Sequence, residues 1–323
     1  MLKTPVVFII FNRPDLTQIV FNEIRKAQPK QLFVIADGPR TPEEQEKCQA
    51  ARDVIKQVDW DCEVFCNYSD MNLGCRERVS SGITWVFEQV EEAIILEDDC
   101  VPAPSFFSFC ETLLDYYRHD ERIMVINGSN FQNGIQRTSY SYYFSRYNDP
   151  WGWATWKRAW NYWSFDKDKW TQFKQENLLE QISSELIEIQ HWRRIFDNLF
   201  FDGEPNSWFY VWMFSCWSQG GLSISPNQNL IKNIGFRKDA THTLSLHSSL
   251  ANLPTQNIWN IEHPLFIVEH KEADFYTFDF RHHGKELKQK QHYWGRLIWL
   301  FNRLLFFLKS PQHLKVKIKE LKK

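Results

Sequence analysis

The sequence lacks the glycine-rich motifs with which many nucleotide-binding proteins hold phosphates. It contains neither the dinucleotide-binding Gly-x-Gly-x-x-Gly nor the Walker phosphate loop. Both motifs let the backbone approach a phosphate closely, and the chain has only 12 glycines in all. Their absence argues against a dinucleotide-dependent oxidoreductase and against an ATPase of the phosphate-loop class.

An excess of charge of one sign is also missing. The 323 residues carry 38 Lys and Arg against 40 Asp and Glu, a net charge of -2, which gives no electrostatic reason to expect nucleic acid. The seven cysteines form an odd set without zinc-binding spacing, so we expect reduced thiols in a cytoplasmic protein. Residues 1–5 lead directly into an apolar run, and we therefore expect no signal peptide.

A long uncharged apolar run is absent as well. Residues 293–308 read YWGRLIWLFNRLLFFL, but Arg296 and Arg303 interrupt them, and a lysine-rich end follows. No 18-residue charge-free span exists, which argues against a membrane-crossing helix. Two interpretations remain open: an amphipathic helix lying on an anionic membrane surface, or a helix docked on the protein's own surface.

Aromatic residues are abundant, with 15 Trp, 11 Tyr and 26 Phe, and many lie between residues 140 and 217. Aromatic faces suit the C–H faces of sugars, and an indole N–H can donate to a hydroxyl group. A tryptophan-rich core explains the same composition for any single residue.

The first part of the chain alternates short apolar runs with helical patterns, which is typical of a βαβ sheet. We expect strands at 6–11, 31–36 and 62–68 and a fourth ending at residue 97, with helices at 16–26, 41–58, 76–90 and 105–118. In the second part we expect strands at 123–126, 140–145 and 222–225, helices at 155–162, 185–201 and 207–219, and a loop at 227–242.

The predicted fold class is α/β, a Rossmann-like mixed sheet flanked by helices. We expect residues 1–130 to form a nucleotide-binding half and residues 131–285 an aromatic-rich second half of the same domain. Residues 286–323 are predicted to form a basic amphipathic tail.

The apolar run at residues 93–96 stops at three consecutive carboxylates, Glu97, Asp98 and Asp99. Open α/β sheets bind ligands at the carboxyl ends of their strands. Adjacent carboxylates repel one another and are costly to bury unpaired. Mg²⁺ or Mn²⁺ with bound phosphates would offset that cost, whereas a solvated acidic loop after a core strand is the simpler alternative.

An ordered series of motifs resembles a known family. FNRP follows the first strand, ADGPR the second, and ILEDD ends the fourth, with NLGCRERVSSG, WGWATW, NLIKNIGF and THT at other positions. Over roughly residues 5–245 the chain resembles bacterial glycosyltransferases of the GT-A fold related to N-acetylglucosaminyltransferase I. The resemblance implies a metal-dependent, inverting transfer from a nucleoside diphosphate sugar, with UDP favoured, to a glycan or lipid-linked acceptor.

The resemblance also implies roles for individual residues. Asp99 and His242 would bind Mn²⁺ or Mg²⁺, and Asp98 would lie near the ribose hydroxyls. Asp37 and Arg13 match positions that hold the base, although Arg13 could equally be a structural partner of Asp37. The implied donor-binding residues are Asn12, Arg13, Asp37, Arg76, Arg78, Glu97 and Asp98. The implied residues of the acceptor or sugar pocket are Trp151, Gly152, Trp153, Trp208 and Trp212.

One position departs from the family's pattern. The relatives read Trp-Asp-x-x-Trp where this chain has Trp208-Phe209-Tyr210-Val211-Trp212, and the missing Asp is the natural general base. Asp202 and Glu204, just upstream, are candidates to replace it. The alternatives are a degenerate domain that binds nucleotide or sugar without transfer and, from another class, a nucleotidyltransferase.

Overall fold

The computed structural model describes residues 1–237, 250–251, 253–294 and 297. His242 and most of the predicted amphipathic tail therefore lie outside the described residues. In the described part, no helix combines the length and apolarity that crossing a bilayer requires.

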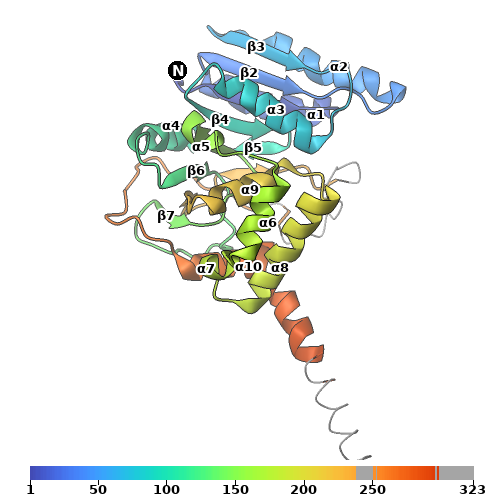
Figure 1. Ribbon diagram of the computed structural model, residues 1–323. Helices are drawn as coiled ribbons and strands as arrows, with labels where there is room; N and C mark the ends of the chain where they lie inside the picture. The colour runs from blue at the N-terminus through green and yellow to red at the C-terminus, as the bar shows by residue number, and fades with distance from the viewer. Residues whose placement is uncertain (238–249, 252, 295–296, 298–323) are drawn as a thin grey trace, which may run out of the picture.

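Eight strands form one mixed sheet in the order β3-β2-β1-β4-β8-β6-β9-β7 (Figure 1). The first four in chain order run parallel: β1 (Val6–Ile10), β2 (Gln31–Ala36), β3 (Glu63–Tyr68) and β4 (Glu92–Glu97). The others are β6 (Ile123–Asn127), β7 (Tyr142–Ser145), β8 (Trp153–Trp156) and β9 (Leu222–Pro226). Strand β8 is antiparallel to both of its neighbours, β4 and β6, so strands of both halves of the sequence share the sheet.

Helices cover both faces of the sheet (Figure 1). One face packs against α1 (Pro14–Ala27), α2 (Gln45–Val54) and α4 (Phe106–Tyr116). The other packs against α3 (Cys75–Phe87), α5 (Lys157–Trp160), α6 (Lys167–Gln175), α8 (Leu186–Asp197) and α9 (Trp208–Ser218). The remaining elements are η1 (Pro42–Glu44), η2 (Ile55–Gln57), α7 (Leu179–Ile182), the π-helical turn η3 (Asn198–Asp202) and α10 (Lys271–Arg281).

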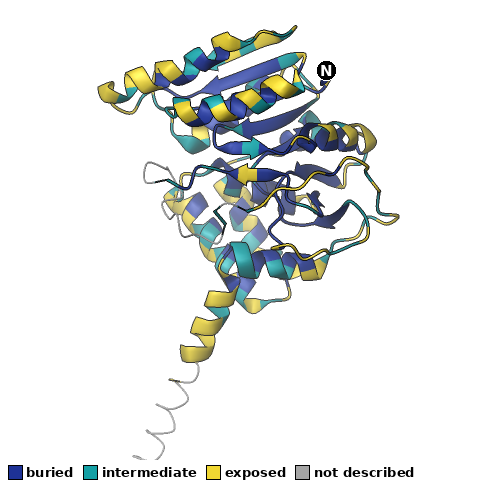
Figure 2. Cartoon of the chain, turned by 180° about the vertical axis from the view of Figure 1, so that it is seen from behind, coloured by how far each residue is buried: buried dark blue, intermediate teal, exposed yellow. Residues whose placement is uncertain are grey.

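Strand β1 shows why these residues form a central strand. Val6 and Phe8 belong to the core cluster on the α1 face, and Val7 to the cluster on the α3 face, since successive side chains point to opposite sides. A parallel strand covered on both faces reads as an unbroken apolar run. Figure 2 shows the result, with buried strands beneath helices whose outer faces are exposed.

The predicted fold class, α/β with a Rossmann-like mixed sheet flanked by helices, is confirmed. The predictions for the first three strands match β1, β2 and β3 within a residue at each end. The helix expected at 41–58 is divided into η1, α2 and η2.

Two predictions for the second half are wrong. The helix expected at 155–162 is strand β8 followed by the single helical turn α5, because Trp153–Trp156 fills the place between β4 and β6. The loop expected at 227–242 contains strand β10 (Ile231–Asn233), which pairs antiparallel with β5 (Cys100–Pro102). This small second sheet brings residues 231–236 back to the acidic end of β4.

Candidate functional site

The carboxyl ends of β1 and β4, which are neighbours in the sheet, bring Arg13 against the acidic run. The Arg13 guanidinium forms an ion pair with Asp98, and its Nη1 lies 3.0 Å from Oδ2 of Asp99. Both aspartates are buried, with exposed fractions of 2% and 9%. One cation therefore bridges two adjacent buried carboxylates.

The charge of this cluster is not balanced by Arg13 alone. Burial and the neighbouring charges of Asp99 and Asp98 raise the pKa of Glu97 to about 8, and a hydrogen bond from the Trp208 side chain only partly opposes this. Burial also raises the pKa of Asp98 to about 6, despite the opposing Arg13. Burial alone would lower the pKa of Arg13, but Asp98 and Asp99 raise it overall. A further positive charge would be stabilised here.

The two-stranded β5–β10 sheet closes the other side of Asp99. The backbone N–H of Ile234 donates to the Asp99 carbonyl at 2.9 Å, and the Asn233 side-chain amide lies 3.5 Å from Oδ1. A Cβ on Gly235 would lie 2.2 Å from Oδ2 of Asp99, so only glycine leaves room for this carboxylate. The motif NLIKNIGF thus supplies a wall of the site rather than a loop.

Residues of β10 and the segment after it contact the WGW segment. The Phe236 ring, next to Gly235, contacts the Trp151 ring at 5.6 Å between centroids. Gly152 has a φ of +60°, and a Cβ there would lie 2.4 Å from Ile231. Asp99 and the Trp151 region are therefore joined through Gly235 and Phe236.

Among the described residues, no cluster of three or more His, Cys, Asp or Glu side chains is arranged to hold a metal ion. Any cation bound here would use one or two carboxylates and take further ligands from a substrate, which is the usual manner of Mg²⁺. The predicted second ligand, His242, lies outside the described part of the chain.

Asp37 anchors a loop. Its carboxylate accepts hydrogen bonds from the backbone N–H groups of Gly38 and Leu73, both at 2.9 Å, and of Gly74 at 3.1 Å. The Asn72 side chain donates a fourth, at 3.0 Å. Since a carboxylate has about four acceptor positions, the protein itself occupies them all. The predicted alternative pairing of Arg13 with Asp37 is wrong, because the ion pairs of Arg13 are with Asp98 and Asp99.

The other predicted donor-binding residues have protein partners. Asn12 donates to Glu44 at 3.0 Å. Arg78 is buried and donates to the Ala36 carbonyl at 3.2 Å and to the Asn67 carbonyl at 2.6 Å, which ties β2 to β3. Arg78 is therefore neither a surface ion pair nor a free phosphate contact.

Arg76 lies elsewhere, at the start of α3. It donates to the Gly203 carbonyl at 2.9 Å and lies 4.1 Å from the Phe165 ring centroid. Its backbone N–H donates to Asn206 at 3.1 Å. The start of α3 is thus packed against residues 203–206, beside the beginning of α9.

Most of the predicted pocket tryptophans are core residues. Trp153 stacks on Trp208 with 5.4 Å between ring centroids and contacts Trp212 at 6.1 Å. Their exposed fractions are 1%, 2% and 1%. Among the predicted pocket tryptophans, Trp151 alone is half-buried rather than buried.

The two carboxylates predicted as candidate bases lie at the surface. Asp202 ends η3 and is exposed, and Glu204 is exposed and accepts a hydrogen bond from the Asn206 backbone at 3.2 Å.

Sequence reasoning missed a buried carboxylate, Asp149, whose Oδ1 lies 3.0 Å from Nε of Arg281 in α10. Its place two residues before Trp151 was a usable signal, whereas nothing in the local sequence marked Arg281.

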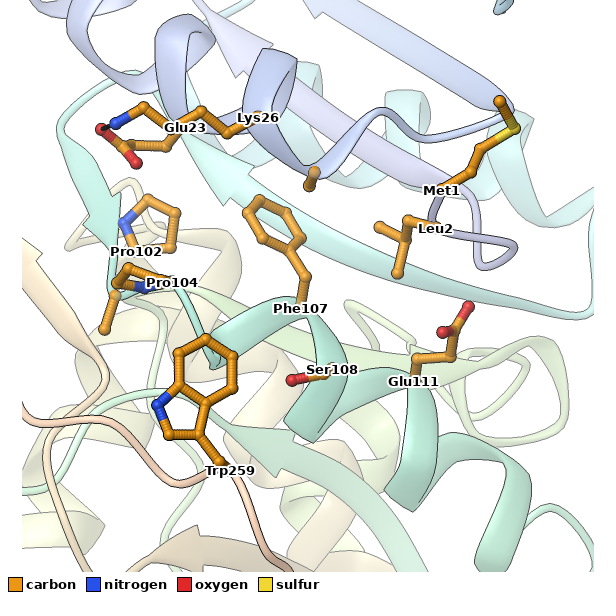
Figure 3. A pocket seen from close by; sticks show the side chains of 12 residues that line it. Met1, Leu2, Glu23, Lys26, Pro102, Pro104, Phe107, Ser108, Glu111 and Trp259 are labelled. Atoms are coloured by element: carbon orange, nitrogen blue, oxygen red, sulfur yellow. Dashed lines mark hydrogen bonds and ion pairs between the residues drawn. The ribbon is translucent and has the colours of Figure 1, made fainter.

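A separate pocket of about 320 Å³ lies between α1 and α4 (Figure 3). Phe107 and Trp259 line it together with Pro102 and Pro104, and Glu23 and Lys26 lie at its edge. No residue predicted from the sequence as part of the site lines this pocket.

A comparison with known protein families finds no match to this chain, and a comparison with curated proteins finds none either. Solved structures show a distant likeness. A UDP-glucose pyrophosphorylase complexed with UDP-glucose has 11% identity and a TM-score of 0.27, over 44% of this chain and 62% of that one. The chain thus spans less than two thirds of that structure.

Two further structures are similar at the same level. A 4-diphosphocytidyl-2C-methyl-D-erythritol synthase from Anaerococcus prevotii has 10% identity and a TM-score of 0.31, over 48% of this chain and 72% of that one. The inositol-1-phosphate CTP transferase from T. maritima has 10% identity and a TM-score of 0.31, over 50% of this chain and 74% of that one. These values identify no family for the chain.

Proposed function

We propose that the protein is a metal-dependent glycosyltransferase that moves a sugar from a nucleoside diphosphate sugar to a glycan or a lipid-linked acceptor, with inversion. The observation that carries the proposal is the cluster of Arg13, Asp98 and Asp99 at the carboxyl end of β4. Its unbalanced negative charge lies at the edge where open α/β sheets bind ligands. The order of motifs that resembles GT-A glycosyltransferases is the second support.

The residues present fit a divalent cation that is shared with a diphosphate. Asp99, whose Oδ2 faces Gly235, would hold it, and Asp98 would lie toward the ribose. A bound Mn²⁺ or Mg²⁺ would neutralise the charge that develops on the departing nucleoside diphosphate. Arg13 orients both aspartates and adds a fixed positive charge at the same edge.

For the donor we favour a UDP-sugar. Asp37 holds residues 72–74 by three hydrogen bonds and accepts a fourth from Gly38, and we propose that it shapes the base pocket through this loop rather than by accepting a hydrogen bond from the base. The half-buried Trp151, whose ring contacts Phe236 next to Gly235, offers an aromatic face to a sugar.

The direct test is release of UDP from a panel of UDP-sugars in the presence of Mn²⁺, with EDTA as the metal-free control. We expect release that requires Mn²⁺ and is lost in Asp99→Asn. The matched control Asp53→Asn changes an exposed carboxylate paired with Lys56 and should behave as the wild type. Release of pyrophosphate from a nucleoside triphosphate would instead indicate a nucleotidyltransferase.

A binding domain without transfer is the second candidate, and Phe209 favours it. This residue is 7% exposed and occupies the helix position at which the resembling enzymes carry their carboxylate. Metal-dependent binding of UDP without release of UDP from any donor would establish the binding domain and exclude the transferase.

We further propose that the protein is cytoplasmic and lies at the inner membrane surface through its tail. Tyr293 and Trp294, at the start of that segment, are 62% and 61% exposed. Exposed aromatic residues beside lysines favour a membrane interface. Truncation after His292 should abolish sedimentation with anionic vesicles and leave the thermal transition unchanged. An altered transition would indicate a tail docked on the domain.

A further inference from the structure

Asp149 is a buried carboxylate in the loop between β7 and β8. Its exposed fraction is 5%, and its backbone N–H donates to Oδ1 of Asn127 at the end of β6 at 2.9 Å. The loop continues directly into Trp151 and Gly152, whose backbone and ring lie against the β10 segment. The fold therefore fixes Asp149 beside the segment that forms the sugar side of the proposed site.

Within the described residues, Arg281 is the one group that pairs with the Asp149 carboxylate. Oδ1 lies 3.0 Å from the Arg281 Nε, but neither of these two atoms has a hydrogen bond of good geometry. The pair is thus held by charge rather than by well-formed hydrogen bonds. A buried carboxylate with so little satisfied acceptor capacity is unusual and calls for a role.

Arg281 connects this carboxylate to the position of the missing base. Its Cζ lies 4.4 Å from the ring centroid of Phe131, 5.1 Å from that of Trp151 and 6.0 Å from that of Phe209. Phe209 stands where the resembling enzymes have their carboxylate. Arg281 therefore contacts both that position and a carboxylate, which comes from the β7–β8 loop instead of from α9.

We propose that Asp149 is the general base of the transfer reaction, which presupposes the function proposed above. The Asp149 carboxylate takes the proton of the acceptor hydroxyl, and the oxygen lone pair forms a bond to the anomeric carbon. The bond from that carbon to the diphosphate oxygen breaks, and its electron pair leaves with the nucleoside diphosphate. Asp149 then returns its proton to solvent.

The surroundings suit this role. Burial raises the pKa of Asp149 to about 6, against the opposing charge of Arg281, and a general base works best when its pKa lies near the working pH. Arg281 is the positioning residue, because it holds the carboxylate while stacking on Trp151 and Phe131. Asp202 and Glu204, in contrast, are exposed side chains.

The test measures UDP release from the best UDP-sugar of the panel, with water as acceptor, together with calorimetric affinity for UDP and Mn²⁺. Asp149→Asn should lower turnover by about 10²- to 10⁴-fold and leave UDP affinity within about twofold. Asp168→Asn, an exposed carboxylate of α6, is the matched control and should retain wild-type turnover. Turnover of Asp149→Asn within threefold of the wild type would overturn the inference.

A second measurement compares pH profiles. Wild-type turnover should fall below about pH 6 more steeply than the residual turnover of Asp149→Asn, because protonation of Asp98, whose pKa is also about 6, affects both proteins alike. A flat profile between pH 5 and 7 would overturn the inference. So would loss of turnover in Asp202→Asn or Glu204→Gln with Asp149→Asn unaffected.

Failure of the proposed function gives a different result. A wild-type protein that does not bind UDP with Mn²⁺ contradicts the transferase itself. A wild-type protein that binds UDP but releases none from any donor leaves a binding domain, in which Asp149 is no base.

Discussion

The carboxylate of Asp99 lies against Gly235, 136 positions further along the chain, at a place where a Cβ would come within 2.2 Å of its Oδ2. A backbone hydrogen bond from Ile234 to Asp99 fixes the same approach. The glycine is required by space, since it leaves room for a carboxylate that a larger residue would displace.

Gly235→Ala should therefore move Asp99 and reduce Mn²⁺-dependent UDP affinity by at least tenfold, while the protein still folds. Calorimetry measures the affinity and circular dichroism the fold. Gly134→Ala is the control for backbone strain, because a Cβ there meets nothing within 4 Å but the φ of +81° disfavours alanine, so this variant should lose stability and keep its UDP affinity. Equal UDP affinity in the Gly235 variant and the wild type would show that Asp99 takes no part in binding.

Arg13→Gln should destabilise the protein in a pH-dependent manner. Removing the partner of two buried carboxylates leaves uncompensated charge, which costs about 3 kcal/mol. Because the pKa of Asp98 is already raised to about 6, protonation at pH 5 relieves much of that cost. Urea unfolding should show the full loss at pH 8 and a smaller one at pH 5. A loss independent of pH would contradict this explanation.

Glu97→Gln should stabilise the ligand-free protein, increasingly so as the pH rises. The pKa of Glu97 is raised to about 8 in the folded protein, so its protonated form favours folding. This stabilisation is complete below the ordinary pKa of a glutamate and is lost as the pH rises toward 8. Thermal unfolding of variant and wild type should therefore converge near pH 4.5 and separate by pH 8. A difference in the opposite direction would show that the Glu97 charge is compensated.

Substitutions of two tryptophans should distinguish a residue that packs in the core from one that contacts the sugar. Trp212→Ala removes a buried ring and should lower the free energy of unfolding by about 3–5 kcal/mol. Trp151→Ala should cost less stability, because this ring is half-buried, but should lower UDP release at least tenfold. Urea unfolding measures the stability of the two variants, and UDP release measures their turnover. Full turnover in Trp151→Ala would show that this residue takes no part in the site.

The sequence was most informative about the parallel strands, and for a physical reason. Strands β1, β2 and β4 are buried on both faces, so each reads as an apolar run that ends at polar residues. The place of Asp99 at the end of β4 follows from that pattern alone.

Short strands with distant partners could not be predicted in this way. β5 and β10 have three residues each and pair across more than a hundred positions, so local pattern does not mark them. The role of Asp37 was ambiguous for another reason, because a polar residue after a strand can contact a ligand or anchor a loop. Only its four hydrogen bonds show the anchoring.

Aromatic composition likewise does not separate core from pocket. Trp153, Trp208 and Trp212 are as apolar as Trp151 in sequence, and only their packing shows them to be core residues. The contribution of α10 was beyond local reasoning too, since Arg281 reaches Asp149 from outside the region of family resemblance.

Calorimetric titration of UDP in the presence of Mn²⁺, for the wild type and Asp99→Asn, measures whether this carboxylate holds a nucleotide through a metal ion. We expect binding by the wild type that requires Mn²⁺ and falls at least a hundredfold in the variant, with Asp53→Asn as the unaffected control. Binding that is equal in the wild type and Asp99→Asn, or indifferent to the metal, would contradict it.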